Sequence, residues 1–71
     1  MKNLFISFVL PAYNEENNVI PLIKSIISSM KNISDNYEIF FVVEGDDNTI
    51  KNLQNYKRSN SNIKVRWLYQ K

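Results

Sequence analysis

The amino-acid sequence predicts an α/β fold in which three parallel strands alternate with two helices. Three observations carry this prediction: two short and almost continuous apolar runs, a helical apolar stripe between them, and an alternating segment near the end. Continuous apolar runs are typical of parallel strands that are buried on both faces. The order strand, helix, strand, helix, strand makes half of a doubly wound sheet. We expect the strand order 3-2-1, which steps the same way twice, so right-handed crossovers place both helices on one face.

The two apolar runs are the predicted first and second strands, over residues 4–10 and 39–43. The first run is followed by Pro-Ala-Tyr-Asn and the second by Glu-Gly-Asp-Asp, so turn-forming or polar residues end both. A third strand is predicted over residues 63–69, where apolar side chains alternate with Lys64 and Arg66. This alternation is typical of a strand that is half exposed.

The first helix is predicted between the two runs, over about residues 18–31. Its apolar stripe follows the spacing of one helix face and consists of Val19, Leu22, Ile23, Ile26, Ile27 and Met30. Asn17 or Asn18 can cap its start through a side-chain oxygen. Pro21 is tolerated only because it falls in the first turn, where the missing N–H costs nothing.

The second helix is predicted over residues 49–58 from a weaker stripe, which Ile50 and Leu53 begin. Asp46 or Asp47 precedes it and supplies an N-cap with a negative charge at the positive end of the helix dipole. We therefore expect these two aspartates to act as caps rather than as ligands.

Composition excludes several classes of function. The 71 residues contain no Cys and no His, so a disulfide scaffold, a zinc site of the usual ligands and mechanisms based on Cys or His are excluded within this chain. A net charge of +2 is too small to indicate binding of nucleic acid. No apolar stretch approaches the roughly 20 residues of a membrane span. The single glycine rules out both glycine-rich phosphate-binding loops.

The candidate site lies where the first two strands end. Ligands of an open parallel sheet bind beyond the carboxyl ends of its strands, which here are residues 11–16 and 44–47. Both segments are acidic and both lead into a helix. Carboxylate acceptors suit ribose hydroxyls and nucleobase N–H groups rather than phosphate. The first loop offers Glu15 as such an acceptor, together with free backbone groups near Pro11 and Ala12.

Both segments resemble family 2 glycosyltransferases. Residues 8–16, Phe-Val-Leu-Pro-Ala-Tyr-Asn-Glu-Glu, are similar to the opening strand and loop of the inverting members. Residues 37–49 are similar to the family's second strand and the Asp-Asp-Gly-Ser turn that follows it. Residues 68–71, Leu-Tyr-Gln-Lys, resemble the third strand of the dolichol- and polyprenol-phosphate sugar transferases. The resemblance spans residues 4–71 and implies a Rossmann-like fold that binds nucleotide sugars.

The resemblance also implies roles for particular residues. Glu15 and the backbone of residues 11–13 would face the ribose and base, and Glu44, one methylene longer than the family's Asp, would contact the base. The candidate nucleotide-binding residues are Pro11, Ala12, Tyr13, Glu15, Glu44 and Gly45. The family's Asp-x-Asp metal motif and its catalytic base lie farther along the chain, so this segment is assigned no catalytic residue and no metal ligand. A divalent metal, Mg or Mn, is expected for the longer protein, and none for this segment alone.

On this basis residues 1–71 are expected to form a single partial domain, the N-terminal nucleotide-binding part of a glycosyltransferase. The longer protein would transfer a sugar from a nucleotide-diphosphate sugar to a polyprenyl phosphate by one inverting displacement, and this segment alone would be inactive. We expect a cytoplasmic location, at the membrane surface for the longer protein. Two alternatives stay open: a non-catalytic α/β module that acts through self-assembly or a protein partner, and a receiver-like fragment whose support is the acidic turn at residues 44–47.

Self-association is a further expectation. With both helices on one face of the sheet, the opposite face, toward which Phe5 and Val9 point, has no helix in this chain to cover it. The first strand is also left at an edge, and no Lys, Pro or bulge interrupts residues 4–10 to protect that edge. We therefore expect a homo-oligomer. Near the site, Glu16 is expected to be structural, and Tyr13 to pack while its backbone takes part in binding.

Overall fold

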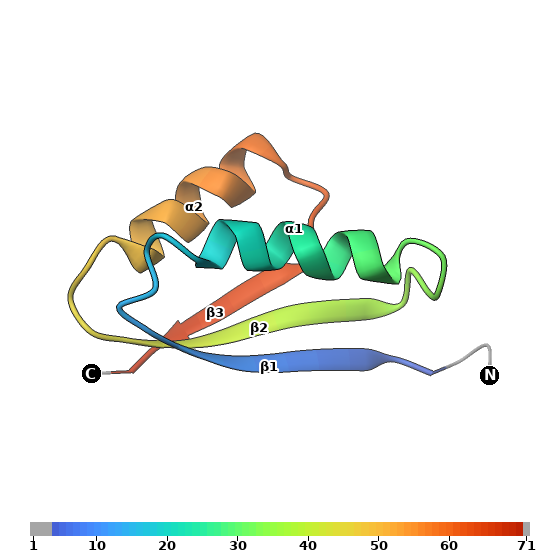
Figure 1. Ribbon diagram of the computed structural model, residues 1–71, viewed down its shortest axis with the longest axis horizontal. Helices are drawn as coiled ribbons and strands as arrows, with labels where there is room; N and C mark the ends of the chain where they lie inside the picture. Colours follow the sequence, from blue (N-terminus) through green and yellow to red (C-terminus); the bar gives the residue numbers. More distant parts are fainter. Residues whose placement is uncertain (1–3, 71) are drawn as a thin grey trace.

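The computed structural model describes residues 4–70 and confirms the predicted α/β fold (Figure 1). The elements in chain order are β1 (Ile6–Tyr13), α1 (Val19–Met30), β2 (Tyr37–Glu44), α2 (Thr49–Ser59) and β3 (Val65–Tyr69). Both helices lie within a residue of their predicted bounds. Lys71, the last residue of the predicted third-strand motif, lies outside the described residues. Among residues 4–70, no helix has both the length and the apolar character needed to cross a membrane.

The three strands form one parallel sheet in the order β1-β2-β3, with β2 in the middle. Read from the opposite edge, this is the predicted order 3-2-1. The register pairs Tyr13 with Glu44 at the carboxyl ends of β1 and β2. The loops that follow these two strands therefore start side by side, which is the condition for a shared site.

β1 begins and ends later than predicted, at Ile6 and Tyr13 rather than at residues 4 and 10. It continues through Pro11, which is paired with Val42. Proline cannot donate to a ladder and is therefore confined to edge strands, which is the place of β1 among the described residues. The sequence pattern suggested a stop at proline, but an edge position removes the penalty.

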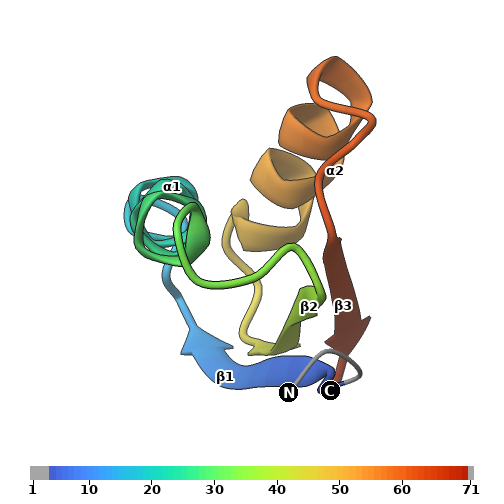
Figure 2. The same ribbon diagram turned by 90° about the vertical axis from the view of Figure 1, so that its right-hand side faces the viewer.

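Both helices cover the same face of the sheet, as predicted (Figure 2). The core lies between the helices and this face, and its buried members are Ala12, Val19, Ile23, Ile39, Phe41, Val43, Leu53 and Val65. The predicted stripe of α1 is buried at Val19, Ile23 and Met30, but Leu22 is 40% exposed. Leu22 lines an open pocket beside β1, and for this reason its side chain stays in contact with solvent.

The two helices start by different means. At α1, Asn18 occupies the cap position, but its side chain makes no capping bond. Instead the Glu15 carbonyl accepts hydrogen bonds from the N–H groups of Asn18 (2.9 Å) and Val19 (3.1 Å), so the predicted asparagine cap is wrong. At α2, the N-cap position belongs to Asn48 and not to Asp46 or Asp47 as predicted, and the Asn48 side chain makes no capping bond. Asp47, one residue earlier, still accepts from the Thr49 N–H at 3.1 Å and from its hydroxyl at 2.7 Å, so its carboxylate binds the first turn of the helix.

The other face of the sheet carries no helix within residues 4–70 (Figure 1). Its apolar side chains are exposed, with 54% of Phe5, 61% of Val9 and 53% of Leu68 open to solvent. The register places Leu68 beside Val42, and Val42 beside Pro11, which makes one apolar row across all three strands. The expected uncovered face is therefore present in these residues.

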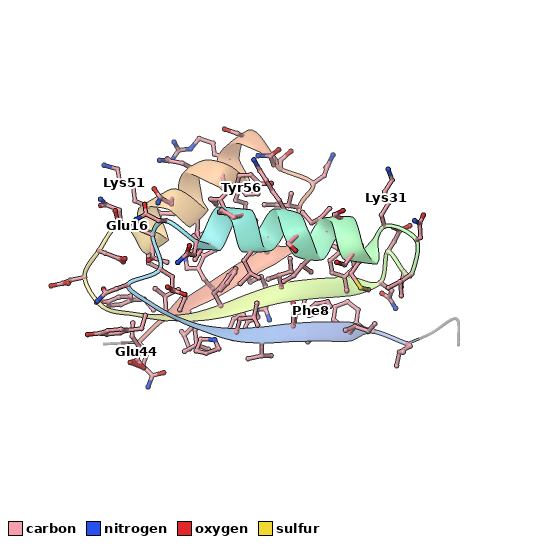
Figure 3. All side chains as sticks on the ribbon, viewed as in Figure 1. Phe8, Glu16, Lys31, Glu44, Lys51 and Tyr56 are labelled. Atoms are coloured by element: carbon pink, nitrogen blue, oxygen red, sulfur yellow. The ribbon has the colours of Figure 1, made fainter. Side chains whose placement is uncertain are left out.

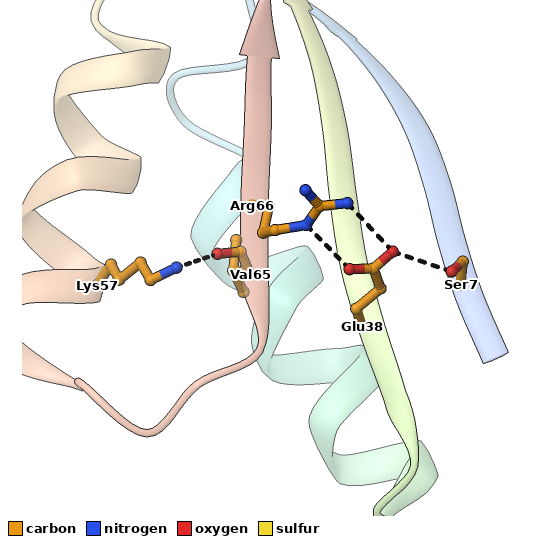
Figure 4. Close-up of polar contacts among 5 residues, drawn as sticks. All are labelled: Ser7, Glu38, Lys57, Val65 and Arg66. Atoms are coloured by element: carbon orange, nitrogen blue, oxygen red, sulfur yellow. Dashed lines mark hydrogen bonds and ion pairs between the residues drawn. The ribbon is translucent and has the colours of Figure 1, made fainter. Parts of the chain in front are cut away.

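Polar contacts cross the same face near the beginning of the strands (Figure 4). Arg66 Nε lies 3.0 Å from Glu38 Oε1, and the Ser7 hydroxyl donates to Glu38 Oε2 at 3.0 Å. The Arg66 guanidinium also lies 4.9 Å from the centre of the Phe40 ring. The hydrogen bond from Arg66, followed by the one from Ser7, lowers the pKa of Glu38. One carboxylate thus ties the three strands together.

Candidate functional site

Two pockets flank the carboxyl end of β1. The first, of about 170 Å³, faces the helices and is lined by Pro11, Ala12, Glu15, Asn18, Val19, Leu22 and Phe41. The second, of about 160 Å³, lies on the side without helices and is lined by Pro11, Ala12, Tyr13, Val42 and Glu44. Both are smaller than the roughly 300 Å³ at which pockets for whole small ligands begin. Each can therefore hold one part of a larger ligand, with Pro11 and Ala12 as their common wall.

Five of the six predicted site residues line one or both of these pockets. Glu15 belongs to the first pocket and Glu44 to the second, so the structure brings them to the same end of the sheet but to opposite sides of Pro11. A chain reversal at Asn14, which has a φ of +51°, separates the two. Glu44 lies at the end of a strand, whereas Glu15 follows the reversal and precedes α1.

The two carboxylates differ in their partners. Glu15 is half-buried, and its Oε1 accepts a 3.3 Å hydrogen bond from the side-chain amide of Asn18. Glu44 lies exposed at the end of the molecule where β2 ends (Figure 3), and its carboxylate makes no hydrogen bond within residues 4–70. A carboxylate oxygen can accept more than one hydrogen bond, so both groups have capacity for a ligand.

Tyr13 does not pack as predicted, because 66% of its side chain is exposed. It is the last residue of β1 and is paired with Glu44, on the face that no helix covers. Its side chain lines the second pocket, which leaves the ring accessible to a ligand. The prediction that only the backbone of Tyr13 takes part in binding depends on a packed ring. Because the ring is exposed, this reason for excluding the ring no longer holds.

Gly45 lines neither pocket, and its importance lies in the backbone. Its φ of +96° is a conformation that other residues rarely adopt, and a Cβ at this position would overlap the side chain of Asn14. Its carbonyl accepts a hydrogen bond from the Tyr69 hydroxyl at 2.9 Å. Gly45 therefore lets the loop after β2 approach the loop after β1, and joins it to β3.

Glu16 and Asp47 connect the two loops, as the structural role predicted for Glu16 requires. The Glu16 N–H donates to Asp47 Oδ2 at 3.1 Å, and the Asn48 N–H donates to Glu16 Oε1 at 3.1 Å. The side-chain amide of Asn52 donates to the Glu16 carbonyl at 2.8 Å. Sequence reasoning missed this pairing, although the parallel register of the strands makes these loops neighbours.

The charge of Asp47 is stabilised by the same contacts. The hydroxyl of Thr49 has the largest effect on the pKa of Asp47 and lowers it, and the N–H groups of Thr49 and Glu16 act in the same direction against the cost of desolvation. Asp47 is therefore an ionised structural acceptor at neutral pH. Both of its oxygens accept hydrogen bonds from the protein, which favours a structural role for Asp47.

The residues present do not fit a metal ion. Within residues 4–70, no group of three or more Asp, Glu, His or Cys side chains comes together as a set of metal ligands. The divalent metal is an expectation for the longer protein, and we derive no chemical step through it.

Comparison with known proteins identifies a family and a relative of this chain. Residues 7–71 match the family model for glycosyl transferase family 2. Over 65 residues the chain is 37% identical to the protein named "Putative glycosyltransferase CsbB" from Bacillus subtilis (strain 168), which covers 90% of this chain and 20% of that protein. The chain thus spans about one fifth of the length of this relative. No solved structure matches it. Since the family model covers every strand and helix almost completely, the chain belongs to glycosyl transferase family 2.

Proposed function

We propose that this chain is the nucleotide-binding part of a glycosyltransferase and holds the nucleoside of a nucleotide-diphosphate sugar. The observation that carries the proposal is the pair of carboxylates on the two sides of Pro11 and Ala12, at the carboxyl ends of adjacent parallel strands. Ligands of open α/β sheets bind at this position. Membership of glycosyl transferase family 2 supports a nucleotide sugar as the ligand.

The two pockets suggest how one nucleoside would lie. Because Glu15 and Glu44 line different pockets with a common wall, a single nucleoside contacts both only by lying across Pro11 and Ala12. In this pose the Glu15 carboxylate accepts from ribose hydroxyls and the Glu44 carboxylate accepts from a nucleobase N–H. The exposed ring of Tyr13 offers the base an aromatic face, a contact that contributes about 1–3 kcal/mol per base in other proteins.

The chemical step belongs to the longer protein in this proposal. There a sugar would pass from its nucleotide diphosphate to a polyprenyl phosphate in one inverting displacement, in the cytoplasm at the membrane surface. Family membership and a relative named as a glycosyltransferase support the transfer of a sugar. The acceptor, the location and the metal rest on the resemblance of the sequence motifs. Residues 4–70 contribute binding and orientation.

The proposal is tested by the affinity of the chain for uridine, guanosine and their diphosphates without metal, measured by ligand-observed NMR. We expect millimolar dissociation constants, equivalent to a binding free energy of about −4 kcal/mol. Binding is weak in this proposal because the diphosphate and the sugar of the nucleotide sugar make no contact with these residues. Glu15→Gln and Glu44→Gln should each weaken nucleoside binding several-fold, because each removes a charged acceptor.

Asp46→Asn is the matched control, since Asp46 is an exposed carboxylate of the same loop and lines neither pocket. It should leave the affinity for the uncharged nucleosides unchanged. Equal losses in all three variants would show a general effect of charge, and unchanged affinity in Glu15→Gln and Glu44→Gln would remove both residues from the site.

A second candidate function is a non-catalytic α/β module that acts by self-assembly. The observation in its favour is the apolar surface of the uncovered face, where Val9 and Leu68 are more than half exposed. A contiguous exposed apolar surface is typical of a contact with another protein surface. The nucleoside titration separates the two candidates, because a purely assembling module has no affinity for nucleosides at the strand ends.

A further inference from the structure

A larger hollow lies at the other end of the molecule, far from the strand ends that form the candidate nucleotide site. It has a volume of about 460 Å³, within the range of about 300–1,000 Å³ that is usual for small-molecule sites. One wall consists of Lys24, Ile27 and Ser28 of α1 together with Lys31, which follows the helix, and Tyr37 of β2 and Tyr56 of α2 face it. Figure 3 shows Lys31 and Glu44 at opposite ends of the molecule. We call this hollow the α1–α2 cavity.

The polar groups of this cavity favour an anion. Lys24 and Lys31 are seven residues apart and thus lie on one side of α1, about 10 Å apart along its axis. The ion pair found within residues 4–70 joins Arg66 to Glu38, so neither lysine is neutralised by a described carboxylate within 4 Å. Asp35 is the single acidic residue in the lining. The balance of charge around the cavity is therefore positive.

A third ammonium group lies close by. A smaller hollow of about 220 Å³ shares Ile27, Asp35 and Tyr37 with the α1–α2 cavity and has Lys64 in its lining. Lys64 Nζ lies 5.2 Å from the centre of the Tyr37 ring. The ring thus lies where the two hollows meet, with cationic groups on both sides.

The floor of the cavity is apolar and aromatic. Met30 is 5% exposed, and Ile27, Tyr37 and Tyr56 are half-buried. The hydroxyls of Tyr37 and Tyr56 make no hydrogen bond within residues 4–70. Every fully buried polar side-chain atom in this part of the chain has a hydrogen-bond partner, so these two unpaired hydroxyls must be in contact with solvent. The lining of the cavity therefore combines two unpaired hydroxyl groups, which can donate hydrogen bonds, with two lysines and an apolar surface.

The end of α1 limits what can bind here. The last carbonyls of a helix carry partial negative charge, and Lys31 is the C-cap residue of α1, where its backbone N–H donates to the Ser28 carbonyl. A bare anion therefore gains less from Lys31 than from an isolated lysine, because the partial negative charge of this helix end repels it. A ligand that also covers the apolar floor gains a second, independent contribution from burial.

We propose that the α1–α2 cavity binds a small organic anion that has an aromatic or short apolar body, with its phosphate or carboxylate held by Lys24 and Lys31. The body lies on Ile27, Met30 and the ring of Tyr37, and the tyrosine hydroxyls donate to the anionic group. The site is separate from the nucleotide pockets and does not depend on the proposed function, because the two places share no lining residue.

The test is a titration of the isotope-labelled 71-residue chain with phenyl phosphate, followed by amide chemical shifts. We expect shifts over residues 24–31 and at Tyr37. Inorganic phosphate, which lacks the apolar body, and benzyl alcohol, which lacks the charge, should each bind at least fivefold more weakly than phenyl phosphate. If either one binds as well as phenyl phosphate, the proposed combination of charge and apolar contact is wrong.

The double variant Lys24→Gln and Lys31→Gln should bind phenyl phosphate at least about fivefold more weakly, since surface ion pairs make small contributions that add. Lys51→Gln is the matched control, because Lys51 is an exposed lysine of α2 that does not line the cavity. Equal affinity in the double variant and the control overturns the proposal. Shifts confined to residues 11–16 and 44–47 also overturn it, and they leave the proposed nucleotide site intact.

Discussion

Replacing Gly45 by alanine should destabilise the fold through two separable effects. The φ of Gly45 is +96°, and a left-handed backbone costs an L-residue about 1–2 kcal/mol. The added Cβ would also overlap the Asn14 side chain, and moving that side chain away from its preferred rotamer costs roughly 0.5–1.5 kcal/mol. We therefore expect Gly45→Ala to lower the free energy of unfolding by about 2 kcal/mol in total, a large fraction of the stability of a small domain.

The second effect disappears when the Asn14 side chain is removed. Asn14 has a φ of +51°, which glycine adopts without strain, so Asn14→Gly is a tolerated background. In that background Gly45→Ala should cost only the backbone part, which gives a coupling energy of about 1 kcal/mol in the double-mutant cycle.

Urea unfolding at one protein concentration, followed by the fluorescence of the half-buried Trp67, measures all four variants. An equal cost of Gly45→Ala in both backgrounds would show that a Cβ at position 45 does not meet the Asn14 side chain. No cost in either background would refute the left-handed backbone at Gly45.

Three further predictions concern the whole chain. Acid should weaken the fold, because hydrogen bonds from Arg66 and Thr49 lower the pKa of Glu38 and Asp47 respectively. The stabilisation that these two ionised carboxylates give the fold is complete above the ordinary carboxyl pKa of about 4, and it is lost as the pH falls through the lowered pKa values. Urea midpoints at pH 7 and in acid measure this loss, which Asp47→Asn should reduce; a midpoint independent of pH contradicts it. We also propose that the 8.4 kDa chain self-associates through its uncovered sheet face or the edge of β1, so sedimentation equilibrium at tens of micromolar should show a larger mass, and a well-folded monomer would contradict this. Finally, these 71 residues should not transfer sugar with or without a divalent metal, and turnover in a nucleotide-release assay would require a new site assignment.

The sequence predicts most of the fold because hydrophobic periodicity carries it. The stripe of α1 and the apolar run of β2 were recognisable, and the structure buries Ile23 and Phe41 as that pattern requires. The end of β1 was not recognisable, since proline usually stops a strand and only the edge position of β1 lets Pro11 continue it. The exposure of Leu22 has a similar cause, because a helical stripe does not show how far the sheet beneath it extends.

The candidate site was predictable by residue but not by geometry. The motifs lead to Glu15 and Glu44, but whether two side chains share a pocket depends on the path of the chain between strand and helix. The positive φ of Asn14 sends Glu15 to the helix side while Glu44 stays on the open face, and neither apolar pattern nor motif spacing reports that reversal. The bonds between Glu16 and Asp47 depend on strand register and were missed for the same reason.

Mapping of nucleotide contacts on the isotope-labelled chain tests the central claim most directly. Uridine, which carries no phosphate and is therefore no ligand of the α1–α2 cavity, is titrated without metal to about 10 mM, a concentration that reveals millimolar binding. The account predicts amide shifts confined to the two loops, residues 12–16 and 44–47, with a response from the Tyr13 ring that follows the same binding curve. Shifts elsewhere on the sheet or helices, or no shifts at the highest concentration, would contradict a nucleotide site at the ends of these strands.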